Sequence, residues 1–125
     1  MAKLSRIDPV KAAKGTWFDY EDDGIRLLIA NIPNQAYEKF LQDRQMSRLK
    51  KGKVSTEERE KLIEEAMANT VLLGWENIDD TPYSVEKALS LLRDPELRHF
   101  KQFVFGRAID DENYKKEVLE LAAGN

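Results

Sequence analysis

The sequence predicts an α+β fold that is mostly α, with an N-terminal β-hairpin packed on a compact bundle of about five helices. Two observations predict it. Aromatic and branched residues alternate on both sides of a turn pair within residues 15–30, and apolar residues recur at helical spacing through residues 33–122. A chain of 125 residues with 42% hydrophobic and 34% charged residues has enough apolar material for one core. We therefore expect a flexible N-terminal arm over residues 1–14 and a single domain over residues 15–125.

The hairpin is predicted by Asp23-Gly24, a favoured turn pair between two short runs rich in strand-forming residues. Thr16, Phe18 and Tyr20 alternate with Trp17 and Asp19 in the first run. The second run, 25–30, is apolar at nearly every position, so we expect helices to cover it. An isolated hairpin is only marginally stable, which requires that it packs on the rest of the domain or on another chain.

Helix boundaries are marked by caps and prolines. Pro33 suits the first turn of a helix that runs to about Leu49, and Ser55 with Glu58 forms a capping box for the next helix. That helix is expected to continue through Val71–Leu73 and to end at Gly74. Later helices are expected to start at Ser84, at Asp94-Pro95 and at Asp110, the last of them reaching residue 122.

Composition limits the possible functions. No cysteine is present, which excludes disulfides, thiolate metal sites and cysteine catalysis, and no apolar run is long enough to span a membrane. Residues 1–53 hold 11 Lys/Arg and 7 Asp/Glu, whereas residues 54–125 hold 9 and 16. The one dense basic cluster lies in residues 44–53, and a nucleic-acid-binding protein usually presents a stronger basic face.

Polar residues do not form a recognisable catalytic motif. His99 is the only histidine, and Asp79 and Asp80 are adjacent residues of a turn whose side chains are expected to point apart. Asp19, Glu21 and Asp23 begin like a calcium loop, but Ala30 stands where that loop needs a bidentate glutamate. We therefore expect no catalytic, metal-binding or cofactor-binding residues, and no cofactor.

Large apolar side chains exceed what one face of a hairpin or helix requires. The domain either buries all of them or leaves some for a partner helix or a second copy of the chain. Both alternatives stay open at the level of sequence. The candidate partner contacts are Trp17, Phe18, Leu28, Phe103 and Phe105.

The central stretch VLLGWENIDDTPYSVEKALSLLRDPELRHF resembles the signature region of the tail assembly chaperones of long-tailed phages, in their short form before a frameshift. The resemblance covers residues 17–122. It rests on the order of a Gly-Trp step, an acidic loop, a Pro-aromatic-Ser step, paired leucines and a DPEL-like helix start. In this chain those residues are Gly74, Trp75, Pro82, Tyr83, Ser84, Leu91, Leu92, Asp94 and Pro95.

The resemblance implies a protein without enzymatic activity that works in the host cytoplasm and is absent from the mature virion. Such chaperones keep the tape measure protein soluble, and they recruit the tail tube protein, often through a longer frameshifted form. The terminal Ala123-Gly124-Asn125 is compatible with a slippery heptamer at which such a frameshift occurs. Self-association is expected, and a membrane is not expected as a partner. The alternative is a small nucleic-acid-associated regulator that uses residues 44–53.

Overall fold

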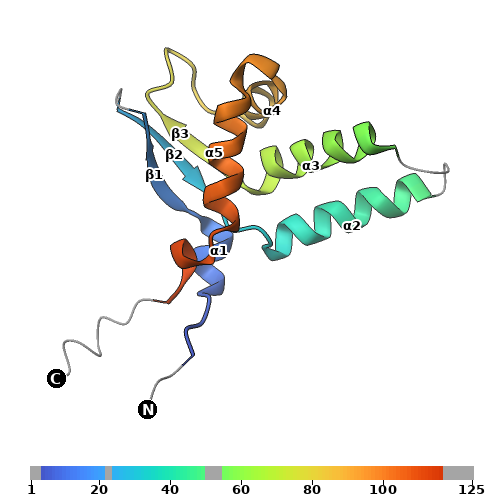
Figure 1. The fold of residues 1–125 in the computed structure, drawn as a ribbon, viewed down its shortest axis with the longest axis horizontal. Helices are drawn as coiled ribbons and strands as arrows, with labels where there is room; N and C mark the ends of the chain where they lie inside the picture. Colours follow the sequence, from blue (N-terminus) through green and yellow to red (C-terminus); the bar gives the residue numbers. More distant parts are fainter. Residues whose placement is uncertain (1–3, 22–23, 50–54, 117–125) are drawn as a thin grey trace.

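A computed structural model of the chain describes residues 4–21, 24–49 and 55–116 (Figure 1). Three strands and five α-helices occur in these residues, together with two short 3₁₀ helices. In chain order the elements are α1 (Pro9–Lys14), β1 (Thr16–Tyr20), β2 (Ile25–Ile29), α2 (Gln35–Leu49), α3 (Thr56–Thr70), β3 (Leu72–Glu76), α4 (Val85–Arg93), η1 (Pro95–Leu97), α5 (Arg98–Ile109) and η2 (Asp111–Tyr114). The predicted class, α+β and mostly helical with an N-terminal hairpin, is confirmed.

The strands form one antiparallel sheet in the order β1-β2-β3. Phe18 lies opposite Leu27 in the hairpin, and Leu28 lies opposite Gly74 across the second pair. The register shifts between Leu28 and Ile29. Alternation along β1 and β2 agrees with the sequence, because Tyr20, Leu27 and Ile29 are buried. The expectation that helices cover the second strand is met on this face only, since Arg26 is exposed and Leu28 is half-buried on the other.

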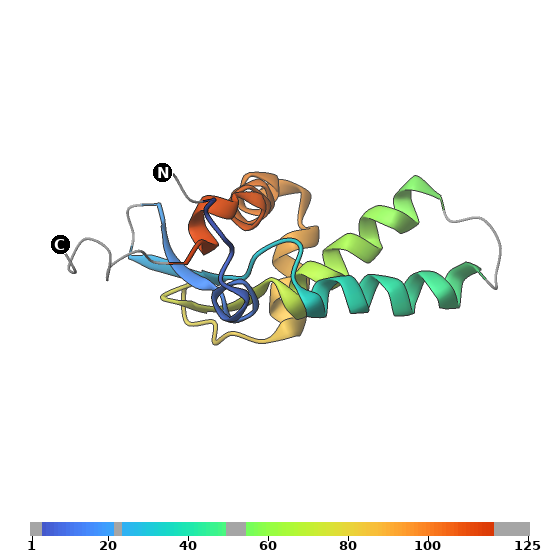
Figure 2. The same ribbon diagram turned by 90° about the horizontal axis from the view of Figure 1, so that it is seen from below.

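Helix α5 covers one face of this sheet, as both views show (Figures 1 and 2). The Tyr20 ring meets the rings of Phe100 and Phe103 edge to face, at centroid distances of 5.4 and 4.9 Å. Such aromatic pairs add stabilisation beyond the apolar area that they bury. The main buried cluster lies between this sheet face and the helices. It comprises Tyr20, Leu27, Ile29, Tyr37, Ala66, Met67, Ala68, Val71, Leu72, Trp75, Ala88, Leu92, Phe100, Val104 and Ala108.

Helices α2 and α3 form an antiparallel pair that projects away from the sheet (Figures 1 and 2). Two adjacent carboxylates on α3 tie it to the helices around it. Glu64 contacts Lys101 of α5 at 2.6 Å and Arg93 of α4 at 3.5 Å, and Glu65 contacts Arg44 of α2 at 3.9 Å. The carboxylate of Glu64 is mostly buried, so water screens its ion pairs less than it screens those on the open surface.

The largest correction concerns the segment after α3. The sequence predicts that this helix continues through Val71–Leu73 and ends at Gly74, but it ends at Thr70 and residues 72–76 form β3. The second edge of β2 needs hydrogen-bond partners for its backbone, and this apolar segment supplies them. Gly74 is therefore a strand residue, whereas the sequence predicts that it ends a helix.

Both ends of the chain also differ from expectation. Within the segment expected to be a flexible arm, residues 9–14 form α1, capped by the Asp8 side chain and with Ala12 buried. Asp110 caps a single 3₁₀ turn, η2, after which Lys115 pairs with Ile7 as an isolated bridge. The remainder of the expected last helix, and the turn residue Asp23, lie outside the described residues.

Candidate interaction surfaces

The sheet face that points away from α5 carries two of the predicted partner contacts. Trp17 lies opposite Leu28, and Leu28 lies opposite Gly74, so these residues form one row across the three strands. Trp17 is 40% exposed, and Leu28 and Gly74 are half-buried. This apolar row is part of a surface that we call the open face. The open face comprises Trp17, Asp19, Arg26, Leu28, Gly74 and Glu76, none of which is buried.

A charged row runs beside the apolar row. Arg26, in the middle strand, lies 3.7 Å from Asp19 and 3.6 Å from Glu76, its neighbours in the two flanking strands. Its guanidinium also lies over the Trp17 ring, 5.0 Å from the centroid. A contact of this kind at an exposed site contributes about 0.5 to 1 kcal/mol and favours this orientation of the ring. Arg26 thus links the two rows, although sequence reasoning did not single it out.

Phe18 and Phe103 belong to a different surface. Phe18 alternates with Trp17 and so points toward α5, where both phenylalanines pack against the main core. The Arg107 guanidinium lies 4.8 Å from the Phe103 ring and 5.9 Å from the Phe18 ring. These two predicted contacts are therefore partly buried and are covered by a cation.

Phe105 lies on α5, on the other side of the sheet from Trp17. It is also 40% exposed, and Ile109, one turn later on the same helix, is 49% exposed. The structure thus divides the five predicted partner contacts among three places: the open face, the Arg107 contact and this stretch of α5.

The signature residues hold the segment from β3 to α5 together. The Trp75 indole Nε1 donates to the Thr81 carbonyl at 2.8 Å, and its ring meets that of Tyr83 at a centroid distance of 5.0 Å. The Tyr83 hydroxyl donates to the Leu72 carbonyl at 2.7 Å, and burial raises the pKa of this phenol. These two hydrogen bonds hold the loop between β3 and α4 against the sheet.

Most of the remaining signature residues begin helices or lie within them. Ser84 and Asp94 accept hydrogen bonds from backbone amides as N-caps, and Pro95 occupies the first position of η1. Leu92 is buried, Leu91 is half-buried and Pro82 is exposed. Most of these residues therefore contact the protein's own core or backbone.

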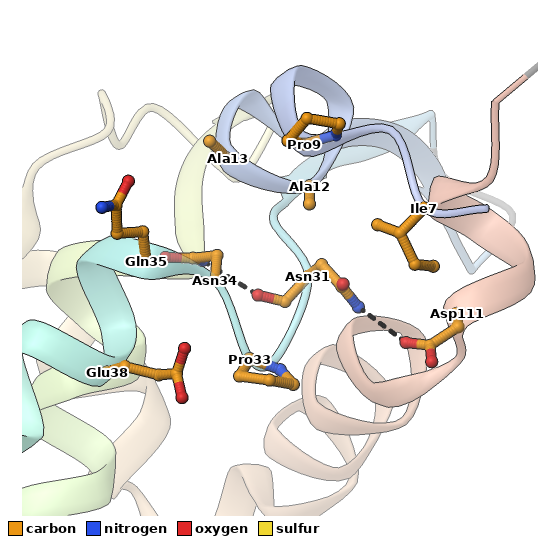
Figure 3. Close-up of a pocket in the computed structure, with 10 residues that line it drawn as sticks. All are labelled: Ile7, Pro9, Ala12, Ala13, Asn31, Pro33, Asn34, Gln35, Glu38 and Asp111. Carbon is orange, nitrogen blue, oxygen red and sulfur yellow. Dashed lines mark hydrogen bonds between the residues drawn. The ribbon is translucent and has the colours of Figure 1, made fainter.

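A junction that the sequence did not reveal lies where β2 leads into α2 (Figure 3). Asn31 and Asn34 are nearly fully buried there. The Asn31 amide donates to the Ala108 carbonyl at 2.7 Å and to Asp111 at 3.3 Å. The Asn34 amide donates to the carbonyls of Asn31 and Thr70 at 2.9 and 3.1 Å, and its oxygen caps α2.

A shallow cleft of about 400 Å³ lies beside this junction. Residues from α1, the start of α2 and η2 line it, including Pro9, Gln35 and Asp111 (Figure 3). The buried side-chain amides join this junction to the ends of α3 and α5 through backbone carbonyls, and to η2 through the Asp111 carboxylate. Their evident role is therefore to hold these segments in place. The Asn-Ile-Pro-Asn stretch marks a turn in the sequence, but its long-range partners appear only in the fold.

The polar residues considered from the sequence lie apart. His99 is exposed, 3.9 Å from Glu21, and Asp79 and Asp80 are exposed in the loop after β3. Among the residues that the structure describes, no three His, Cys, Asp or Glu side chains are grouped so as to hold a metal ion. Within the same residues, no helix combines the length and the apolar character needed to cross a bilayer.

The basic segment is only partly described. The Arg44 guanidinium contacts Glu65 at 3.9 Å and lies 4.9 Å from the centroid of the Phe40 ring. It therefore stacks on its own helix and pairs with α3. Residues 50–53 of the segment fall outside the described residues.

The structure is that of a small α+β protein. Its three-stranded sheet has one open face, and the antiparallel helices α2 and α3 project away from the sheet. A family model described as YdaY prophage protein matches residues 32–125. The chain therefore belongs to this prophage protein family. No curated protein and no solved structure gives a match. The match begins after β2, so it includes Gly74 of the open face but not Trp17 or Leu28.

Proposed function

We propose that this prophage protein is a tail assembly chaperone without enzymatic activity. It binds the tape measure protein of its siphovirus-like prophage and keeps that protein soluble in the host cytoplasm until the tail is built. A longer frameshifted form recruits the tail tube protein, and several copies act along one client. The chaperone is not retained in the mature virion.

Two observations from sequence support the proposal. Membership of a prophage protein family places the chain among proteins encoded by integrated phages. The segment from Gly74 to Leu97 resembles the signature of tail assembly chaperones. Within it, Trp75 and Tyr83 hydrogen-bond the loop after β3 to β3 itself. The resemblance therefore falls on residues that determine the shape of the domain.

The observation that carries the proposal is the apolar row of the open face. A tryptophan, a leucine and a glycine lie side by side at the surface, and the tryptophan is 40% exposed. A tape measure protein is a long helical chain whose apolar stripes aggregate when they are uncovered. A small domain with uncovered apolar surface is suited to shield such stripes.

The alternative function, a nucleic-acid-associated regulator, receives less support from the described part of residues 44–53. Arg44 is already paired with Glu65 and stacked on Phe40, which reduces its availability to phosphates. Binding of duplex DNA that weakens steeply with salt would favour this alternative over the chaperone.

The test is co-expression of the chain with the tape measure protein encoded by the same prophage. The proposal predicts that the tape measure protein moves from the insoluble to the soluble fraction and co-purifies with the chain. An insoluble client beside well-folded chaperone, with the longer frameshifted form also supplied, would contradict the proposal.

A further inference from the structure

Gly74 is a strand residue beside the register shift between β2 and β3. Its φ lies outside the left-handed range, and a Cβ built on it would meet Leu28 at 3.8 Å and Trp17 at 4.0 Å, which are ordinary contact distances. Glycine weakens a strand because it loses more backbone entropy than other residues and packs no side chain. A glycine in a strand often marks a bulge or a place where another chain or a ligand approaches closely. Gly74 fits both descriptions, because it adjoins the register shift and lies on the open face.

The surroundings of Gly74 form a site for an inserted side chain. Leu28 lies beside it, and beyond Leu28 lies the Trp17 ring, which the Arg26 guanidinium contacts. Neighbouring strands are about 4.8 Å apart, so the row across three strands spans roughly 10 Å. That width equals the diameter of one α-helix with its side chains.

An acidic rim borders the row at the end of the sheet that carries the hairpin turn. Asp19 and Glu76 lie on the open face itself, and the Asp19 side chain is 89% exposed. Asp79 and Asp80 are exposed in the loop after β3, which is joined to the hairpin turn by a 2.9 Å hydrogen bond from Asn77 to the Gly24 carbonyl. Figure 1 shows this loop beside the end of β1 and the start of β2. Arg26 is the one cation among these carboxylates in the described part of the open face.

We infer that the open face docks one amphipathic α-helix of the client, with a large apolar side chain over Gly74 and Lys or Arg residues directed at the acidic rim. This inference rests on the proposed function and specifies both the surface and the chemistry of the partner. Charge complementarity selects the occupant, because a basic flank pairs with the rim, whereas a second copy would bring its own carboxylates against it.

The test compares three variants of the open face with one matched control. Gly74→Lys fills the space over the glycine, Trp17→Ala removes the exposed ring, and Asp19→Lys reverses the rim charge. Phe105→Ala truncates an equally exposed aromatic side chain on the other side of the sheet. Binding is measured by fluorescence anisotropy with overlapping 30-residue peptides that span the tape measure protein, and folding is checked by circular dichroism and urea unfolding.

The inference predicts that a subset of peptides binds the wild type and that each open-face variant weakens this binding about tenfold or more, whereas Phe105→Ala leaves it unchanged. The peptides that bind are expected to carry Lys or Arg beside an apolar stripe, and added salt is expected to weaken their binding. Should Gly74→Lys fail to fold, Trp17→Ala and Asp19→Lys decide the question, because both side chains are exposed.

Three results would overturn the inference. In the first, the wild-type chain keeps the tape measure protein soluble, but the open-face variants bind the peptides as tightly as Phe105→Ala does. This result overturns the docking surface and leaves the proposed function standing. A Gly74→Lys variant that loses only self-association, seen by light scattering, makes a second copy the occupant. Wild-type chain that fails to solubilise the client in co-expression overturns the proposed function and this inference with it.

Discussion

Trp75 is the side chain whose removal we expect to destabilise the domain most clearly. It is only 7% exposed, packs edge to face on Tyr83 and donates from its indole to the Thr81 carbonyl. It also lies opposite Leu27 in the sheet, so it joins β3 to the core and to the loop that follows. Truncation to alanine removes all of these contacts at once.

The expected magnitude follows from area and hydrogen bonding. A buried tryptophan removes roughly 200 Å² from water, which at about 25 cal/mol per Å² amounts to about 5 kcal/mol as an upper bound. Measured truncations of buried aromatic residues cost about 3 to 5 kcal/mol. We therefore expect Trp75→Ala to lower the free energy of unfolding by about 4 kcal/mol. Trp75→Phe keeps most of the ring but leaves Thr81 without its donor, and should cost about 1 to 2 kcal/mol.

Urea unfolding followed by far-UV circular dichroism measures both losses. Trp17→Ala is the matched control within the same chain, because Trp17 is 40% exposed and should cost less than about 1 kcal/mol. The reasoning would be refuted if Trp75→Ala lowered the free energy of unfolding by no more than Trp17→Ala does. Such a result would mean that Trp75 does not connect β3 to the core.

Three further predictions concern buried polar groups. Asn34→Ala should cost about 2 to 3 kcal/mol in unfolding experiments, because it removes the cap of α2 and two donated hydrogen bonds. Burial raises the pKa of Tyr114 above its ordinary value of 10.0, so the contribution of this phenol to the free energy of unfolding should be constant below pH 10 and should be lost above it, where the unfolded phenol ionises. Tyr114→Phe should therefore lessen the alkaline loss of stability in unfolding curves. Glu64→Gln should cost about 1 kcal/mol by loss of the ion pairs with Arg93 and Lys101, and this difference should shrink in high salt.

Each of these has a contrasting result. Asn34→Ser keeps an oxygen that can cap α2 without burying a charge, so a loss equal to that of Asn34→Ala would contradict a contribution from the cap. An alkaline transition that Tyr114→Phe leaves unchanged would assign the pH dependence to other tyrosines. A cost for Glu64→Gln that does not change with salt would indicate packing rather than charge.

Much of the fold was predictable because its signals are local. The alternation of Phe18 and Tyr20 with Trp17 predicts the hairpin, and the caps at Ser55, Ser84 and Asp94 place three helix starts correctly. The buried face of α5, with Phe100, Val104 and Ala108, follows from helical spacing alone.

The errors arise where long-range partners decide the structure. Residues 71–73 continue the apolar pattern of α3, so a helix is the local prediction, but pairing with β2 makes the segment a strand. Helix α1 had a usable local signal, since Asp8 followed by Pro9 is a cap and first-turn pair. This six-residue helix is stabilised by contacts that the sequence does not display, such as the hydrogen bond from the Asn31 backbone N–H to the Ala12 carbonyl.

The candidate surface was only partly visible in the sequence. Composition identified the excess of aromatic residues, but whether Trp17 or Phe18 reaches solvent depends on which sheet face α5 covers. The sequence predicts that Gly74 ends a helix, and only the register of β3 places it beside Leu28. In the sequence Arg26 is indistinguishable from any other strand charge, whereas its contacts with Trp17, Asp19 and Glu76 place it in the open face.

The most direct test of the central claim uses Trp17 as its own reporter. In a Trp75→Phe variant Trp17 is the sole tryptophan, because the chain has two. The tape measure peptides that bind are titrated into this variant while its emission is recorded. The account predicts a saturable blue shift as the ring leaves water beneath a client helix. Peptide binding confirmed by anisotropy, with Trp17 emission unchanged, would contradict the claim that the client docks on the open face.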